Sequence, residues 1–256
     1  MKTLIVLGGS SDIIKHTLPL ILDQFDKIIL QHSGSNPNFE GLIIKEIKEI
    51  KEIEKKKEFI EDKIQTIKAD FSSKQGIDQW IDLVKLQCDV PTAIIHACAP
   101  KLKLLRLKEI SYDTLLEEFN VQYYSFSATV SSFGPKMQKA KNGKIVIVGS
   151  SSTIGVPPAF LSHYVSMKYA LLGLCKSLAA EMSTYGIQVN TVSPSLMETK
   201  FLTNIPEKFS ELAAEKNPTK KNLDCKSVAN LISFLLSEKC SGITGANFPI
   251  TNGETF

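Results

Sequence analysis

Long hydrophobic runs and a marked excess of either charge are both missing from this sequence of 256 residues. No apolar stretch approaches the roughly 18 residues that a membrane-spanning helix needs, and the net charge at pH 7 is only +3. Proteins whose main partner is a nucleic acid usually carry a clear basic excess. The sequence therefore predicts a globular protein that binds neither a membrane nor a nucleic acid.

Cysteine and histidine are also scarce, with five and four residues. The cysteines lie far apart without a Cys-x-x-Cys pair, and the histidines do not gather at metal-ligand spacings. We therefore expect reduced thiols in the cytoplasm, with no disulfide framework and no metal site. The apolar run near the N-terminus, Leu4–Leu7, is shorter than the roughly 7–15 residues at the core of a signal peptide.

Short apolar runs, several of them β-branched, alternate with longer amphipathic stretches. Such runs are typical of strands buried on both faces of a parallel sheet, and the stretches between them have helical periodicity. The alternation predicts a Rossmann-like α/β fold, a doubly wound parallel sheet of about seven strands flanked by helices. The predicted strands are Leu4–Leu7, Ile28–Leu30, Ile64–Ala69, Ala93–Ala97, Lys144–Val148, Ile187–Val192 and Asn247–Ile250.

No Pro/Gly-rich linker divides the chain, so residues 1–256 are expected to form one domain. The predicted helices are Ile13–Leu22, Lys74–Lys85, Tyr112–Ala140, Ser162–Tyr185, Glu207–Glu215 and Ser227–Ser237. One further stretch, residues 45–63, alternates lysines with acids around an isoleucine stripe. Mixed charge of this kind usually marks a solvated helix face, and a partner-binding helix is the alternative.

A glycine-containing turn follows the first predicted strand and opens the first helix: Leu7-Gly8-Gly9-Ser10-Ser11-Asp12-Ile13-Ile14. Glycine lets backbone N–H groups approach a ligand, and a helix N-terminus favours an anion, so a dinucleotide pyrophosphate is expected here. An ordinary strand-to-helix turn, with Ser10 or Ser11 as the N-cap, would have the same sequence.

The end of the second predicted strand favours NADP(H) over NAD(H). An NAD site usually places an acid there for the ribose 2′-hydroxyl, but the turn reads Gln31-His32-Ser33-Gly34-Ser35-Asn36 and the next acid is Glu40. A small polar turn around Ser33 tolerates a 2′-phosphate. The preference should be modest, because the turn holds no arginine to grip that phosphate.

The strongest chemical signal is Tyr164-Val165-Ser166-Met167-Lys168, because residues i and i+4 share one face of a helix. A lysine ammonium beside a phenol is expected to lower the pKa of Tyr164 and make it an acid/base group near neutral pH. Ser151 stands 13 residues before Tyr164, just after a predicted strand. Its hydroxyl is expected to share a substrate carbonyl with Tyr164.

These features resemble the short-chain dehydrogenase/reductase superfamily, and the likeness runs nearly from end to end. It implies that Ser151, Tyr164 and Lys168 are the catalytic serine, tyrosine and lysine, and that Asn120 holds a proton-relay water. Ser152 competes with Ser151, since Ser152-Thr153-Ile154-Gly155 also resembles the family motif after a one-residue deletion. The 13-residue spacing favours Ser151.

The resemblance also implies a set of cofactor contacts. Gly8 to Ile14 falls on the family's Thr-Gly-x-x-x-Gly-x-Gly turn, Asp70 on its acid near the adenine, His96 to Ala99 on Asn-Asn-Ala-Gly, and Ser193 to Thr199 on the nicotinamide motif Pro-Gly-x-x-x-Thr. The expected contacts with NADP(H) are Gly8, Ser10, Ser11, Asp12, Ile13, Ser33, Asp70, Phe71, Ala97, Tyr164, Lys168, Pro194, Ser195 and Thr199.

Several residues depart from the family pattern. Asp12 and Ile14 replace two of the three glycines of the turn, Leu7 replaces its threonine, and Ala97 lacks the family's side-chain amide. A carboxylate at position 12 is expected to repel the pyrophosphate, and Ile14 adds bulk where helix and strand normally pack closely. These departures predict a weakened or remodelled cofactor site.

The resemblance implies an NADP(H)-dependent oxidoreductase that reduces a carbonyl or oxidises an alcohol, closest in pattern to 3-oxoacyl-carrier-protein reductases. A homotetramer or dimer is expected, with a substrate lid around 199–222. A non-catalytic nucleotide-binding or assembly protein on the same fold is the alternative, because fold does not fix function. The substrate stays open among acyl thioesters, steroid-like ketones and carbohydrate-linked ketones.

Overall fold

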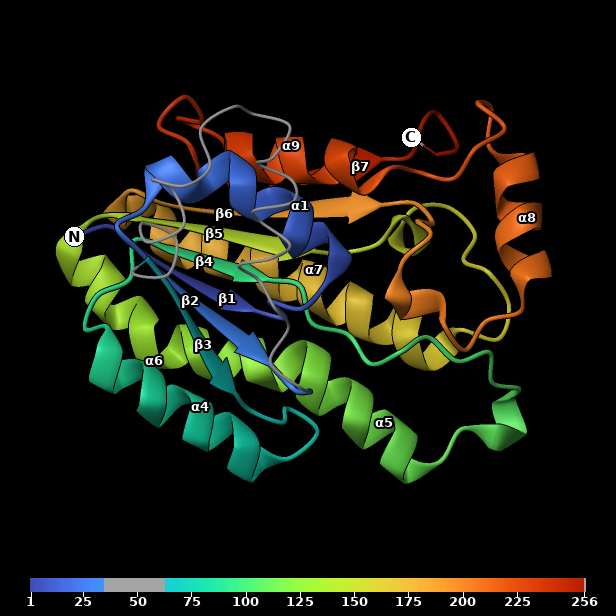
Figure 1. Cartoon of the computed structure of the whole chain (residues 1–256), viewed down its shortest axis with the longest axis horizontal. Helices are drawn as coiled ribbons and strands as arrows, with labels where there is room; N and C mark the ends of the chain where they lie inside the picture. Colours follow the sequence, from blue (N-terminus) through green and yellow to red (C-terminus); the bar gives the residue numbers. More distant parts are fainter. Residues whose placement is uncertain (35–62, 256) are drawn as a thin grey trace, which may run out of the picture.

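Within residues 1–34 and 63–255, which the computed structural model describes, seven parallel strands form one sheet in the order β3-β2-β1-β4-β5-β6-β7 (Figure 1). Apart from Lys63, the charged stretch at 45–63 lies outside the described residues. The predicted fold class is confirmed, and each predicted apolar run coincides with one strand. The strands are β1 (Thr3–Leu7), β2 (Lys27–His32), β3 (Ile64–Lys68), β4 (Ala93–His96), β5 (Gly143–Val148), β6 (Ile187–Pro194) and β7 (Asn247–Ile250).

The central strands read as continuous apolar runs because both faces of the sheet are covered. In β1 every residue is buried, and successive side chains enter different cores. Leu4 and Val6 pack in one hydrophobic cluster with residues of α1 (Asp12–Ile21) and α9 (Cys225–Leu236). Ile5 and Leu7 point the other way, because neighbouring side chains of a strand alternate between faces.

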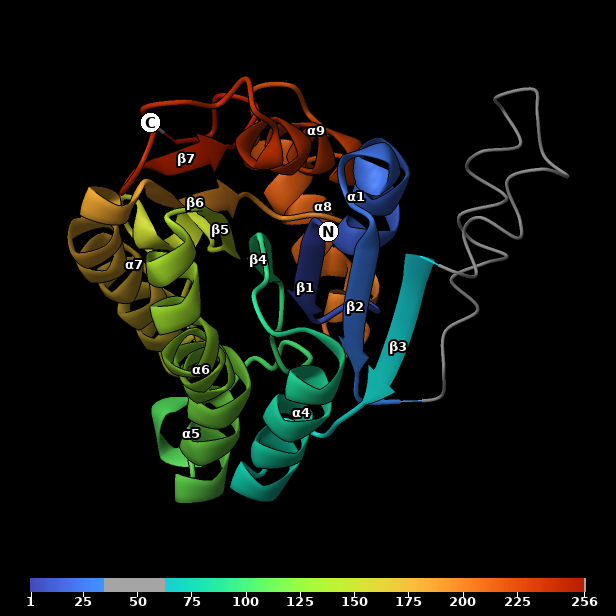
Figure 2. The same cartoon turned by 90° about the vertical axis from the view of Figure 1, so that its left-hand side faces the viewer.

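The second face is covered by α4 (Lys74–Gln87), α6 (Ser125–Ala140) and α7 (Ser162–Met182). Figure 2 shows these three helices on one side of the sheet, with α1 and α9 on the other. Trp80 of α4 lies fully buried in this core. Helices on both faces of a parallel sheet make the doubly wound architecture, which hides the central strands from solvent and leaves the edge strands β3 and β7 partly exposed.

The helix predicted over Tyr112–Ala140 is interrupted. It consists of α5 (Tyr112–Glu118), a π-helical stretch η3 (Phe119–Tyr124) and then α6. π-helical turns inside α-helices are rare and often lie at functional sites. Asn120 lies within this turn.

The sheet sets the place of a binding site. From β1 the strand order runs to β2 and β3 in one direction and to β4 in the other, so β1 and β4 are the point where the order reverses. Ligands of open α/β sheets bind beyond the carboxyl ends of the strands at this reversal. The short 3₁₀ turn η6 (Lys200–Leu202) and α8 (Glu207–Lys216) follow β6 and lie past the carboxyl ends (Figure 1).

No helix within the described parts of the chain combines the length and apolar character needed to cross a bilayer.

Replacing Gly76 by alanine should destabilise the fold. Gly76 lies in the first turn of α4, and a Cβ atom there would sit 1.9 Å from the carbonyl oxygen of Asp70. That overlap forces the turn after β3 away from the helix, at a cost of about 1–3 kcal/mol. Urea denaturation of Gly76→Ala against the native protein measures the loss.

Gly173→Ala is the matched control. Gly173 lies in α7, and nothing stands within 4 Å of a Cβ atom built there. Alanine has the higher helix propensity, so this variant should gain up to about 1 kcal/mol. Equal stability of the two variants would contradict the close contact at Asp70.

Candidate functional site

A cavity of about 910 Å³ opens at the carboxyl ends of the strands. Loops after β1, β4, β5 and β6 line it, together with α7 and the segment around α8. Its volume lies at the upper end of what ligand sites usually enclose. It brings together all the predicted site residues except Asn120: Gly8, Ser10, Ser11, Asp12, Ile13, Ser33, Asp70, Phe71, Ala97, Ser151, Tyr164, Lys168, Pro194, Ser195 and Thr199.

The turn after β1 is pressed against the end of β4. Gly8 has φ +83°, and a Cβ atom there would lie 2.7 Å from the backbone carbonyl group of Ala97. Only glycine fits such a contact in this conformation. Ser11 is the N-cap of α1, since its Oγ accepts from the N–H of Ile14 at 3.3 Å. The bare backbone of the turn and the helix N-terminus suit the phosphates of a dinucleotide.

Gln31 is a structural residue of the site that the sequence did not reveal. Its Oε1 accepts from the N–H of Gly8 at 2.9 Å, and its Nε2 donates to the carbonyl oxygen of Ala69 at 2.7 Å. The buried side chain thereby joins the turn after β1 to the end of β3. In this geometry Gln31 supports the cavity wall, while Ser33 and Gly34 beyond it are exposed.

The carboxylate of Asp12 does not stand alone. It accepts from Nζ of Lys15 at 2.6 Å and from the backbone N–H of Lys200 at 2.8 Å. Partial burial alone would raise the pKa of Asp12, but the hydrogen bonds from Lys15 and Lys200 outweigh burial and lower it. The charge expected to repel a pyrophosphate is thus paired with a cation and tied to η6.

Ile14, the other unusual residue of the turn, is fully buried among the core residues of α1 and α9. Its bulk therefore packs into the hydrophobic layer behind the turn instead of into the cavity.

Tyr164 and Lys168 lie one turn apart on α7, both buried. Nζ of Lys168 is 5.5 Å from the centre of the Tyr164 ring and donates to the carbonyl oxygen of Val148 at 3.0 Å. Burial raises the pKa of Tyr164 to about 12 and lowers that of Lys168 to about 8. The pKa of Tyr164 is thus raised and not lowered as expected, because burial and the charge of Glu118 disfavour the phenolate more than the hydrogen bond with Ser150 favours it.

The serine in contact with Tyr164 is Ser150. A hydrogen bond between the Ser150 side chain and the phenol partly offsets the raised pKa of Tyr164. Oγ of Ser150 also accepts from Ser152, from its N–H at 3.2 Å and its Oγ at 2.8 Å. Ser151 and Ser152 line the same cavity. The 13-residue spacing selects Ser151, whereas the hydrogen bond with Tyr164 comes from Ser150. Ser150 is the second residue after β5 ends, and this position was the signal in the sequence that could have indicated it.

Asn120 lies beside the cavity instead of lining it. Its side-chain Nδ2 donates to the backbone carbonyl oxygen of Ser72 at 2.8 Å. The backbone carbonyl oxygen of Asn120 accepts from the N–H of Ser125, five residues further along the chain. The side chain therefore joins the π-helical turn to the loop after β3, where Asp70 and Phe71 lie.

The loop after β6 completes the cavity. Ser195 donates its N–H to the carbonyl oxygen of Ile250 at 2.9 Å, while its buried Oγ has no hydrogen-bond partner in the described structure. An unpartnered buried hydroxyl that lines a cavity suits a polar ligand group, such as a carboxamide. Phe201 of η6 lies with its ring centre 5.6 Å from that of Tyr164.

No group of three or more His, Cys, Asp or Glu in the described ranges is placed to hold a metal ion. The five cysteines are free and buried.

Comparison with known proteins agrees with this architecture. A family model described as enoyl-(acyl carrier protein) reductase matches residues 42–255. The 3-oxoacyl-[acyl-carrier-protein] reductase MabA of Mycobacterium avium is 32% identical over 190 residues, which cover 73% of this chain and 72% of that protein. The 3-oxoacyl-[acyl-carrier-protein] reductase FabG of Thermotoga maritima is 32% identical over 150 residues, 59% of either protein.

Solved structures share the fold over almost the whole chain. A short-chain dehydrogenase/reductase from Serratia marcescens has a TM-score of 0.82 at 19% identity, covering 100% of this chain and 98% of its own. ElxO with NADP bound has a TM-score of 0.79 at 21% identity, covering 99% and 98%. The family model spans most of the sequence and the fold agrees with it, so the chain belongs to the short-chain dehydrogenase/reductase superfamily.

Proposed function

We propose that the protein is an NADP(H)-dependent oxidoreductase that reduces a carbonyl group or oxidises the matching alcohol. One observation carries the proposal: the Gly8 turn, suited to phosphates, and the pair Tyr164–Lys168 line the same cavity. The relatives named as 3-oxoacyl-carrier-protein reductases support this reaction class. A ketone of an acyl thioester, a steroid-like compound or a carbohydrate derivative could meet the chemistry of the site.

The chain's own residues supply proton transfer and orientation. The hydride exchanged with the substrate carbon would be supplied by a nicotinamide held in the cavity. Tyr164 gives a proton to the carbonyl oxygen, or takes one from the alcohol, through its Oη. The raised pKa keeps Tyr164 protonated at neutral pH, which suits the reductive direction. Lys168 holds a positive charge behind the phenol and would bind the nicotinamide ribose, and Ser150 or Ser151 would orient the carbonyl oxygen.

The cofactor would extend along the carboxyl edge of the sheet. Gly8, Ser10, Ser11 and Ile13 would hold the pyrophosphate, with Asp12 and its lysine beside it. Asp70, Phe71 and Ala97 would enclose the adenine side, and Pro194, Ser195 and Thr199 the nicotinamide. The unpartnered Oγ of Ser195 and the close fit at Gly8 support this path. Asn120 would hold a proton-relay water from the π-helical turn.

We further propose one domain over residues 1–256, with a substrate lid around 199–222 formed by η6 and α8. We also propose a cytoplasmic location and a homotetramer or dimer. Exposed apolar residues on the outer helices, such as Leu115 of α5 and Tyr169 of α7, support the self-association. Asp12 and Ile14 depart from the family turn and motivate the second candidate, a non-catalytic nucleotide-binding protein. Cofactor binding without turnover on any ketone would favour it.

Tyr164→Phe should lower turnover by a factor of about 10²–10⁴, since it removes the proton donor and little else. NADPH oxidation is followed with a panel of 3-oxoacyl thioesters, cyclic ketones and keto sugars. NADPH binding, measured by fluorescence titration, should stay within a few-fold of the native protein's. Turnover close to native in this variant would refute the assignment of Tyr164.

The two serines can be separated by matched substitutions. Ser150→Ala should lower turnover more than Ser151→Ala, because Ser150 makes the hydrogen bond with Tyr164. The steady-state rate of each variant on the best ketone of the panel decides between them. A larger loss in Ser151→Ala would restore the assignment from the 13-residue spacing.

The cofactor should be NADPH in preference to NADH, by several-fold. No acid among residues 27–34 is placed to hold a 2′-hydroxyl at the end of β2, and a carboxylate there would repel a 2′-phosphate. Dissociation constants from fluorescence titration measure the preference. Ser33→Asp should weaken NADPH and spare NADH. Tighter binding of NADH by the native chain would reverse the assignment.

A further inference from the structure

The cavity is apolar around Tyr164. Tyr164 shares a small hydrophobic cluster with the buried residues Leu102 and Leu161. Phe201 of η6 packs against this cluster, and its ring centre lies 5.6 Å from that of Tyr164. All four residues line the cavity. The phenol proposed as the proton donor therefore stands among hydrocarbon side chains.

The lid adds a second apolar surface. α8 has no buried residue, yet its Phe209 and Ala213 line the cavity. These two residues are four positions apart and so share one face of the helix. Lys208 and Glu211, by contrast, are exposed and pair with each other at 3.6 Å. The helix is thus amphipathic, and its apolar face borders the cavity instead of a hydrophobic core.

The loop after β5 adds a third. Residues 154–161 read Ile-Gly-Val-Pro-Pro-Ala-Phe-Leu and carry no polar side chain. Ile154, Val156 and Pro158 line the cavity, and Val156 is 96% exposed. Exposed apolar surface in a ligand cavity favours a ligand that covers it with apolar surface of its own.

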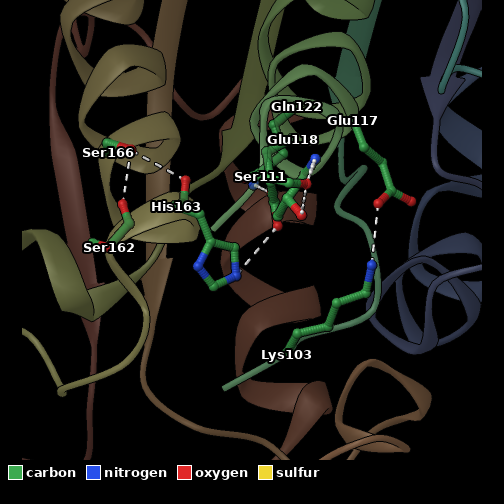
Figure 3. A network of polar contacts seen from close by, with 9 residues as sticks. Lys103, Ser111, Glu117, Glu118, Gln122, Ser162, His163 and Ser166 are labelled. Atoms are coloured by element: carbon green, nitrogen blue, oxygen red, sulfur yellow. Dashed lines mark hydrogen bonds and ion pairs between the residues drawn. The ribbon is translucent and has the colours of Figure 1, made fainter. Parts of the chain in front are cut away.

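The charged and polar side chains of the cavity wall lie elsewhere or are already paired. Glu117 of α5 pairs with Lys103, in the loop after β4, at 3.2 Å (Figure 3). Lys101 and Glu254 line the cavity but are exposed. Thr255 follows β7, the strand hydrogen-bonded to the loop proposed to hold the nicotinamide. None of these groups belongs to the hydrophobic cluster around Tyr164.

Such a compartment distinguishes ketones by what surrounds the carbonyl group. A substrate hydroxyl placed against Leu102, Phe201 or Phe209 would lose its hydrogen bonds to water and gain none from these side chains, which makes its burial costly. A hydrocarbon group in the same place would be favoured by its removal from water. Tyr164 and the serines after β5 stay available for the one oxygen that reacts.

We propose that the substrate is a ketone with a hydrocarbon group beside its carbonyl group, and that Phe201 and Phe209 of the lid select that group. The inference rests on the proposed function, in which Tyr164 is the proton donor. Among the substrates named above, it favours those with a hydrocarbon body and excludes carbohydrate-linked ketones.

Diethyl ketone and dihydroxyacetone form a matched pair of substrates, because each methyl group of one takes the place of a hydroxyl of the other. With NADPH, kcat/KM should be about 10²-fold higher for diethyl ketone, the discrimination that an apolar pocket supplies against a hydroxyl. Among methyl ketones with ethyl to heptyl chains, kcat/KM should rise about three- to fourfold per methylene. Equal values for the matched pair, or a flat series, would overturn the inference.

Variants of Phe201 locate the selection. Phe201→Ser should raise KM for the heptyl ketone about tenfold and change kcat little, since binding alone is weakened. Phe201→Leu keeps an apolar side chain and should keep the native series. In both variants the backbone carbonyl oxygen at position 201 can still accept from the N–H of Leu102 at 3.1 Å, so the lid keeps this tie.

Phe234→Ser is the matched control, because Phe234 lies at an exposed position of α9 and does not line the cavity. It should leave the chain-length series unchanged. A fall in kcat on every ketone alike in Phe201→Ser, with KM unchanged, would show that Phe201 only supports Tyr164 and would overturn its role in selection.

Binding can also be measured without turnover. NADP⁺ cannot reduce a ketone, so calorimetric titration of the methyl ketones onto the protein with NADP⁺ reports affinity alone. If affinity rises with chain length, and less so in Phe201→Ser, the apolar compartment stands even where NADPH reduces no ketone and the proposed function fails. Affinity independent of chain length overturns the inference. Preferential reduction of keto sugars would also overturn it, while the proposed function would stand.

Discussion

The arrangement of this molecule depends on a close contact between two backbone segments at the centre of the sheet. The turn after β1 can meet the end of β4 only because residue 8 is a glycine in a left-handed conformation. That contact closes the floor of the cavity where the strand order reverses. Gln31 reinforces it from the neighbouring strand, with hydrogen bonds to Gly8 and to Ala69. The position of the proposed phosphate-binding turn follows from this arrangement.

Much of the fold could be predicted because each signal was local. Strands buried on both faces need continuous apolar runs, and helices covering a sheet need apolar stripes, so both left direct traces in the sequence. The interruption of the helix at Phe119–Tyr124 left none. A π-helical turn is stabilised by tertiary contacts, here the hydrogen bond from Asn120 to Ser72, and periodicity alone reads the whole stretch as one helix.

The site was less predictable for the same physical reason. Counting residues back from Tyr164 selects Ser151, but a loop can lengthen by one residue while the strand that precedes it keeps its register. The contact with Tyr164 is made by Ser150, the second residue after β5 ends. The pKa of Tyr164 also depends on burial, which the pattern Tyr-x-x-x-Lys does not encode. The sequence thus indicated which side chains line the cavity better than it indicated the pKa of Tyr164.

Asp12 joins two parts of the molecule that are far apart in sequence. Through the backbone of Lys200, its carboxylate anchors the first residue of η6 to the start of α1. A glycine at this position, as in the family pattern, would cut that anchor. Replacing Asp12 by the glycine of the family pattern would then loosen the proposed lid, while it cleared space beside the proposed pyrophosphate site. What looks like decay of a motif is, in this chain, a hydrogen bond that joins the turn after β1 to the segment proposed as the lid.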